Sequence, residues 1–221
     1  MYILAIGPSS KKYATGQSIH FESVCRKLDN VSVLNYAKYN SVFLDAVILV
    51  LNLVLSRVYK KFSIIYYTPS RTNGGTIRDL LTLAILTIGR TNIKIYGHVH
   101  GSELVEFFNS ANALTKFMIR WVYNQHSETF VLSNTIGCQI SSLLKVSTKT
   151  IYNTLDLDEG LPDFSGNKVD SKVNLLWCSN LIYTKGFTYF ADAILALPVQ
   201  YLQSCRITII GKVLGDSFKS R

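Results

Sequence analysis

The chain has 221 residues, of which 48% are hydrophobic and 17% are charged, and this balance excludes a disordered or low-complexity protein. There are 23 Lys and Arg against 14 Asp and Glu, and the resulting net charge of +9 favours anionic partners: phosphorylated small molecules, anionic lipid surfaces or nucleic acid. The basic residues are scattered and no aromatic stacking motif accompanies them, so we do not expect nucleic-acid binding.

No targeting or membrane-spanning segment is predicted. The N-terminal apolar run is short and has no basic lead-in, unlike a signal peptide, and no run reaches the roughly 18 apolar residues that span a bilayer. The cysteines lack the spacing of a metal site, and three of the four sit in apolar surroundings that predict core packing. They are Cys25, Cys138, Cys178 and Cys205. A reducing cytoplasm fits this pattern.

The chain opens with a predicted buried strand, Tyr2–Ile6, which is followed by a Gly/Ser/Lys loop and a helix that starts near Ser18, a good N-cap. A helix N-terminus offers free N–H groups and the positive end of a dipole, both suited to phosphate. Gly16 in this loop is either a turn glycine or a phosphate contact, and no dinucleotide or P-loop fingerprint is present. The expected core face of the helix consists of Phe21, Val24, Cys25 and Leu28.

Phe43–Leu55 is apolar nearly all round, which favours a fully buried helix. The alternative is a helix that lies on a membrane, with Arg57, Lys60 and Lys61 directed toward anionic headgroups.

Strands and helices are predicted to alternate through the first 152 residues. The further strands are Val31–Leu34, Ser63–Thr68, a strand around Ile95 to Val99, Phe130–Leu132 and Thr150–Tyr152. The further helices run from about Ile77 to Ile88 and over Ser110–Val122 and Thr135–Leu144, and another element of unspecified type is expected to begin within Glu103 to Phe108. This alternation predicts an α/β fold with a doubly wound parallel sheet.

The strand around Val99 ends in His98-Val99-His100-Gly101, at the end of the strand where α/β proteins bind ligands. A histidine there can hydrogen-bond a hydroxyl or phosphate of a ligand. The alternative is a purely structural role, in which it only forms hydrogen bonds within the loop. Gly101 lets the chain turn. Arg78 and Asp79 lie in the first turn of a helix. Either they form a solvated ion pair, or Arg78 faces a central cleft at the ligand-binding end of the sheet.

A polar segment with Pro and Gly, residues 156–172, is predicted to link a first domain (1–155) to a second one (173–221). The second domain restarts the strand–loop–helix pattern, with a strand at Val173–Cys178, a helix ended by Pro198 and a strand at Arg206–Ile210 before the turn at Gly211. Two strands and one helix cannot form a self-sufficient core, so this domain is expected to be incomplete.

Several motifs, in order, resemble family 4 glycosyltransferases of the bacterial polysaccharide-assembly type, which have the two-domain GT-B fold. The matching segments are GQS at 16–18, GTIRDLL at 75–81, IYGHVHGSE at 95–103, IYNTLDLDE at 151–159, LLWCSNLIYTKGF at 175–187 and ITIIGK at 207–212. The resemblance implies two Rossmann-like domains, the first for the acceptor and the second for the nucleotide sugar.

By position, the resemblance implies that His100 is the active-site histidine near the transferred sugar, with Gly101 beside it and His98 as the competing candidate. Gly16 would approach the donor phosphates or the acceptor. In the second domain, Lys185 would pair with the diphosphate.

Asn180 stands where many members carry an arginine for the same diphosphate, which leaves less positive charge there. The resemblance implies no cofactor and no metal, because basic side chains and helix N-termini would take up the diphosphate charge.

The implied activity is a retaining transfer of a sugar from a nucleoside-diphosphate sugar to a lipid-linked saccharide, at the inner face of the cell membrane. The family's Glu-x7-Glu element would lie after Arg221. The chain is therefore expected to be either a fragment of a longer enzyme or a truncated, catalytically inactive domain that binds a membrane or a partner.

Overall fold

The computed structural model describes residues 2–10, 15–36, 42–59, 62–90, 92–101, 103–152, 172–181 and 183–213. The chain divides into two compact units, Met1–Asp158 and Glu159–Arg221, and this division falls in the segment predicted as a linker. Residues 153–171, which include most of that segment and part of the IYNTLDLDE motif, lie outside the described residues.

The first unit is built on a sheet of six parallel strands in the order β2-β1-β3-β4-β5-β6. The strands are β1 (Ile3–Pro8), β2 (Val31–Tyr36), β3 (Ile64–Tyr67), β4 (Lys94–Val99), β5 (Glu128–Val131) and β6 (Thr148–Thr150). This confirms the doubly wound, Rossmann-like α/β architecture. The chain first winds from β1 to β2 and then continues on the other side of β1, so the topological switch point lies between β1 and β3.

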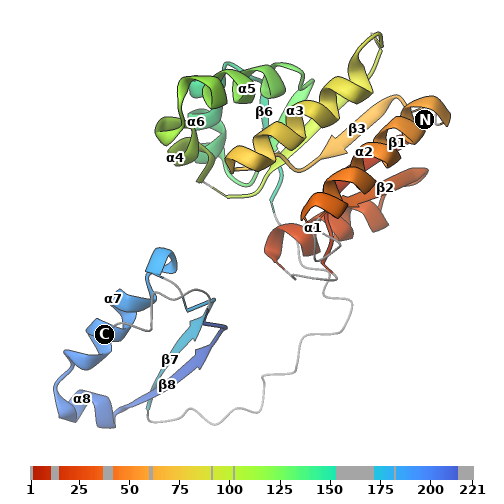
Figure 1. Cartoon of the computed structure of the whole chain (residues 1–221). Coiled ribbons are helices and arrows are strands. Elements are labelled where there is room, and N and C mark those ends of the chain that lie inside the picture. Colours follow the sequence, from red (N-terminus) through yellow and green to blue (C-terminus); the bar gives the residue numbers. More distant parts are fainter. Residues whose placement is uncertain are drawn as a thin grey trace. The chain divides into compact units, whose positions relative to one another are not determined.

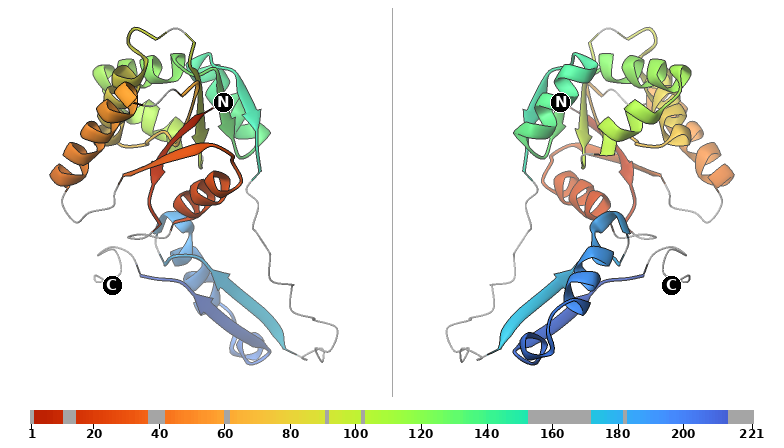
Figure 2. Two further views of the ribbon diagram at one scale, coloured as in Figure 1. Left: turned by 90° about the vertical axis from the view of Figure 1, so that its right-hand side faces the viewer. Right: turned by 90° about the vertical axis from the view of Figure 1, so that its left-hand side faces the viewer.

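Within the described part of this unit, six helices cover the sheet in an uneven distribution (Figures 1 and 2). They are α1 (Gly16–Arg26), α2 (Val42–Tyr59), α3 (Asn73–Thr87), α4 (Glu103–Ser110), α5 (Ala113–Asn124) and α6 (Asn134–Leu144). Side chains of α2 to α6 share one large core with the strand residues of one sheet face. The core of the other face is small and contains Phe21 and Cys25 of α1 with Ala5 and Tyr66 of the sheet.

Helix α1 begins two residues earlier than expected. Thr15, not Ser18, is the N-cap, and the two residues form a capping box in which the Thr15 side chain accepts from the Ser18 N–H and Ser18 Oγ accepts from the Thr15 N–H at 2.9 Å. Similarly, α5 begins at Ala113 because the Asn112 side chain caps the Thr115 N–H at 2.8 Å, so the expected start at Ser110 was wrong.

Helix α2 corrects the expectation of a fully buried helix. Between residues 46 and 58 only Leu49, Leu53 and Ser56 are buried, and all seven exposed positions in this stretch are apolar. The helix forms part of the outer layer, so only one side of it meets the core. Within the described ranges, no helix has the length and apolar character needed to cross a membrane.

The cysteines also depart from expectation. Cys25 is buried in the core beneath α1, Cys205 is half-buried, and Cys138 and Cys178 are exposed. Cys138 is exposed because it lies on the outer side of α6, whose buried positions are Gly137, Ile140 and Leu144.

The second unit contains a two-stranded parallel sheet, β7 (Val173–Cys178) and β8 (Cys205–Ile210), which confirms both predicted strands. They are joined by a 3₁₀ turn, η1 (Tyr183–Lys185), and by helices α7 (Phe187–Leu195) and α8 (Val199–Gln203), of which α8 was not predicted. Trp177 of β7 packs against Phe187 and Phe190 of α7 with ring centroids 5.3 and 5.2 Å apart. None of the described residues in these two helices is fully buried.

Candidate functional site

The candidate site of the first unit lies at the carboxyl ends of β1, β3 and β4, next to the topological switch point. Three features meet there: the N-terminus of α1, the loop after β3, and the end of β4 with its two histidines. In open α/β sheets this is the edge where ligands bind.

Three imidazole rings form a cluster at this edge. His98 of β4 and His100, the first residue after β4, are two residues apart and lie on the same side of the sheet, as the sequence predicted, with ring centroids 4.2 Å apart. His20 of α1 approaches both rings edge-on, with a centroid distance of 5.1 Å to each. We call His20, His98 and His100 the histidine cluster.

The histidine cluster is neutral at physiological pH. Burial is the main cause that lowers the pKa of His98 to about 3 and of His100 to about 4, and the pKa of His20 is also lowered by burial. The neighbouring imidazoles lower the first two pKa values further, and Arg71 contributes for His100. At pH 7 these rings can donate and accept hydrogen bonds, but they do not supply positive charge.

Much of the cluster's hydrogen-bonding capacity is unused. The Nδ1 of His98 lies 2.9 Å from the hydroxyl of Tyr66, a hydrogen bond that orients this ring. The Nε2 atoms of His20 and His98 and both ring nitrogens of His100 are buried and have no hydrogen-bond partner among the described residues. Buried polar atoms without partners cost free energy, and their concentration in one place is typical of a functional site.

Arg71, in the loop after β3, joins the parts of the site. Its Nη1 donates to the backbone carbonyl of His100 and forms an ion pair with Glu103 of α4, while its Nη2 donates to Gln17 of α1 at 3.3 Å. Its positive charge helps to lower the pKa of His100.

The two candidate glycines differ in what the backbone requires. Gly101 has a φ of +104°, and a Cβ there would come within 2.7 Å of Arg71 Nη1, so the turn after β4 requires glycine. Gly16 is the first residue of α1 and has no atom within 4 Å of the position of a Cβ. Among the described residues, none packs against this position, and its backbone does not require glycine.

Arg78 and Asp79 form a partly buried pair, which corrects the alternative of a solvated pair. Arg78 Nη2 lies 2.7 Å from Asp79 Oδ1, and its guanidinium lies 3.7 Å from the centre of the Tyr36 ring. Asp79 Oδ2 accepts from the Ser70 N–H at 2.6 Å. Burial raises the pKa of Asp79 even though Arg78 acts against it. The pair therefore anchors α3 to the loop that carries Arg71.

In the second unit, the two residues expected near the diphosphate lie between β7 and α7. Asn180 is exposed in the loop directly after β7, and Lys185 is exposed at the end of η1, just before the N-terminus of α7 at Gly186. Gly186 has a φ of +82°, and a Cβ on Gly211 would collide with the carbonyl of Ser179, so both glycines shape this edge.

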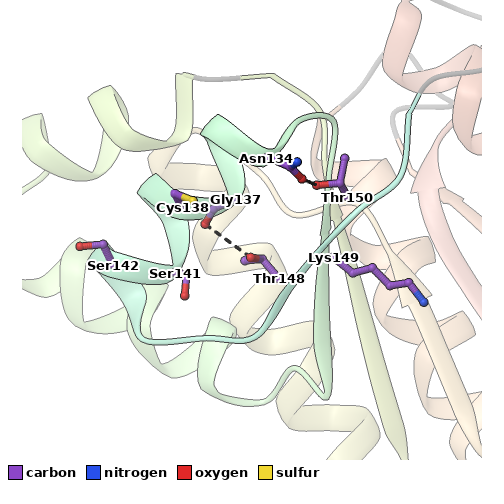
Figure 3. Close-up of a pocket in the computed structure, with 8 residues that line it drawn as sticks. All are labelled: Asn134, Gly137, Cys138, Ser141, Ser142, Thr148, Lys149 and Thr150. Carbon is purple, nitrogen blue, oxygen red and sulfur yellow. Dashed lines mark hydrogen bonds between the residues drawn. The ribbon is translucent and has the colours of Figure 1, made fainter.

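Two of the pockets lined by described residues lie beside the first unit's sheet. One, of about 550 Å³, lies on the sheet face covered by α1 and reaches the histidine cluster at His98. It is lined by Ile3, Val24, Leu28, Ile64, Tyr66, Tyr96, His98, Glu128, Phe130, Lys149 and Ile151. The other, of about 710 Å³, is an open groove between α6 and β6 that is lined mainly by Ser, Thr and other small residues (Figure 3). In Figure 3 the side chain of Lys149 points away from Thr148 and Thr150, as strand alternation requires.

Sequence reasoning missed His20, Tyr66 and Arg71 as members of the site. One indication of His20 was available in the sequence: it lies directly before Phe21, the first residue of the predicted core face of α1. Within the described residues, no group of three or more His, Cys, Asp or Glu side chains is arranged to hold a metal ion.

No protein-family model matches the chain, and no curated protein is significantly similar to it in sequence.

Proposed function

We propose that the chain belongs to a retaining glycosyltransferase that moves a sugar from a nucleoside-diphosphate sugar to a lipid-linked saccharide acceptor. The proposal rests on the ordered resemblance of six motifs to family 4 glycosyltransferases. The observation that supports it most is the histidine cluster at the carboxyl end of β4, where buried imidazole nitrogens have no partner among the described residues.

In this proposal the neutral imidazole of His100 hydrogen-bonds a hydroxyl of the transferred sugar. Its pKa of about 4 suits this task, because the ring stays uncharged at pH 7 and both donates and accepts. His98, held by Tyr66, would support the orientation of His100 by stacking against it. The backbone N–H groups at the N-terminus of α1, near Gly16, would donate hydrogen bonds to an anionic oxygen of the ligand.

The second unit would bind the donor's diphosphate through Lys185, whose ammonium offsets the charge that develops on the leaving group. Asn180 would donate a hydrogen bond from its amide. When the bond between the anomeric carbon and the diphosphate oxygen breaks, the diphosphate leaves with the bonding electron pair. The acceptor hydroxyl forms the new bond to that carbon, and its proton passes to the departing diphosphate oxygen.

The test is the release of nucleoside diphosphate from UDP-, GDP- and ADP-linked hexoses, with and without extracted membrane lipid as acceptor. We expect His100→Ala and Lys185→Ala each to lower turnover by roughly 100-fold, the effect of removing one group that stabilises the transition state. Lys94→Ala is the matched control, because Lys94 is exposed at the opposite end of the same strand as His98. Undiminished turnover in both site variants would refute the site assignment.

A second candidate is a binding domain that does not transfer sugar. The exposed apolar side chains of α2 favour it, because a surface of this kind can bind a membrane or a partner whether or not the chain is catalytically active. Absence of both donor binding and turnover in the 221-residue chain, with lipid binding retained, would favour this candidate over the first.

A further inference from the structure

The outer surface of the first unit carries an unusual concentration of exposed apolar side chains. Helices α2, α3 and α5 pack side by side in this order on one face of the sheet (Figure 1). The exposed apolar side chains on or next to these helices are Val47, Val50, Leu51, Val54, Leu55, Val58, Ile77, Leu81, Ile88, Leu114 and Phe117. We call this set the outer apolar face.

Helix α2 contributes most of this face. A helix on the surface of a globular domain normally shows polar residues to solvent, whereas the exposed positions of α2 from residue 46 to residue 58 are all Ala, Val or Leu. Leu51 is 57% exposed and Leu55 is 51% exposed, so these side chains are available to a partner. Contiguous apolar surface of this kind marks an interaction site.

The charges on these helices indicate the type of partner. Arg57 and Arg90 lie at the carboxyl ends of α2 and α3, where Arg57 donates to the carbonyls of Ile85 and Ile88. Lys116 and Arg120 lie on α5. Among the described side chains of the three helices, Asp79 is the one carboxylate, and it is buried against Arg78.

An apolar surface with cations and without an exposed carboxylate among its described side chains fits an anionic lipid headgroup layer. A second copy of the chain is a poor occupant, because two such surfaces would bring arginines and lysines together, and none of the described side chains of these helices is an exposed carboxylate that could pair with them. The geometry is that of a helix lying in the interface plane with its apolar side toward the acyl chains, and not of a spanning helix.

We propose that the outer apolar face docks the first unit onto an anionic phospholipid bilayer, with α2 inserted at the level of the headgroups and Arg57, Arg90, Lys116 and Arg120 near the phosphates. This proposal identifies the surface and the partner, and it does not require that the chain transfers sugar.

The experiment is co-sedimentation of the 221-residue chain with vesicles of phosphatidylcholine and phosphatidylglycerol. We expect binding at low salt, weaker binding to pure phosphatidylcholine and weaker binding at 0.5 M NaCl, because salt screens the attraction of the cations. The double variant Leu51→Ser/Leu55→Ser should bind at least 10-fold more weakly. Ile19→Ser, at an exposed apolar position on α1 on the opposite sheet face, is the matched control and should change binding less than twofold.

Three outcomes would overturn the proposal: no vesicle binding at low salt, equal binding by the double variant, or a concentration-dependent dimer of the parent chain that the double variant abolishes. The last outcome would assign the face to self-association. All substituted leucines are exposed, so unchanged circular dichroism and melting temperature are expected and show that the variant is folded. The His100→Ala variant should bind vesicles like the parent, which separates a failure of this proposal from a failure of the proposed activity.

Discussion

The imidazole of His98 stacks on that of His100 at a centroid distance of 4.2 Å, with an angle of 26° between the ring planes. Two protonated rings at this distance in a buried site would repel each other, and the ring of His20 adds a third potential charge. Burial and these neighbouring rings make protonation of the cluster unfavourable in the folded state, which links the stability of this edge of the sheet to pH.

We expect the first unit to lose stability in acid. His98 and His100 have folded pKa values of about 3 and about 4, below the value of about 6.5 in an unfolded chain, so below pH 6.5 the unfolded state binds protons that the folded state does not. Each such histidine lowers the free energy of unfolding by about 1.4 kcal/mol per pH unit as the pH falls from 6.5 toward its folded pKa. Above pH 6.5 the histidines contribute no pH dependence.

Urea unfolding between pH 7 and pH 5 measures this slope. The His98→Gln variant, which removes one such proton, should show a smaller slope than the parent chain. The difference should approach about 1.4 kcal/mol per pH unit near pH 5, where the unfolded histidine is almost fully protonated. Equal slopes in the two proteins would mean that His98 is not held neutral by the fold.

Two glycines give a second prediction with an internal control. Gly101→Ala should destabilise the first unit by roughly 1–2 kcal/mol or more, because a Cβ is unfavourable at a φ of +104° and would collide with Arg71. Gly16→Ala should be neutral or stabilising by up to about 1 kcal/mol, because the position is helical and open. Thermal or urea unfolding of both variants is the measurement, and a loss of stability in Gly16→Ala equal to that in Gly101→Ala would contradict it.

The sequence predicted the parallel sheet and the pairing of His98 with His100 because both follow from short-range periodicity. Strand alternation places residues two apart on one face, and the alternation of strands with helices predicts parallel strands with one ligand-binding edge. His20 could not be added in this way. It lies on another element, and the rotation of α1 against the sheet is set by Phe21 packing beside Gly7, a contact between distant segments.

The wrong prediction for α2 has a different origin. An all-round apolar helix favours burial when only its own residues are considered, but burial depends on how many layers surround the helix. Here α2 lies in the outer layer, with Leu49 and Leu53 toward the core and Leu51 and Leu55 exposed. The periodicity of the sequence could not report whether a further layer covers these two leucines.

The pair formed by Arg78 and Asp79 gives a third prediction. Asp79→Asn should lower the free energy of unfolding by roughly 2–3 kcal/mol, because it leaves a half-buried guanidinium without a countercharge and weakens the bond to the Ser70 N–H. Glu106→Gln removes an exposed carboxylate on α4 and should stay within about 0.5 kcal/mol of the parent. Urea unfolding at pH 7 compares the two, and an equal, small effect would show that the Asp79 pair contributes little.

The last prediction concerns the coupling of His20 to the other two rings. Replacing His20 by Gln removes a potential charge that contributes to the lowered pKa of both His98 and His100, so the pKa of each should rise. His126 provides the control in the same sample, because burial alone lowers its pKa to about 3 and its ring contacts Tyr67 and Thr129 instead of the histidine cluster. NMR titration of the imidazole C–H signals reports each ring separately. A rise for His98 and His100 with no change for His126 is the expected result. A similar rise for all three would mean that the substitution had loosened the whole unit, and no rise for any would show that His20 does not influence the charge state of its neighbours.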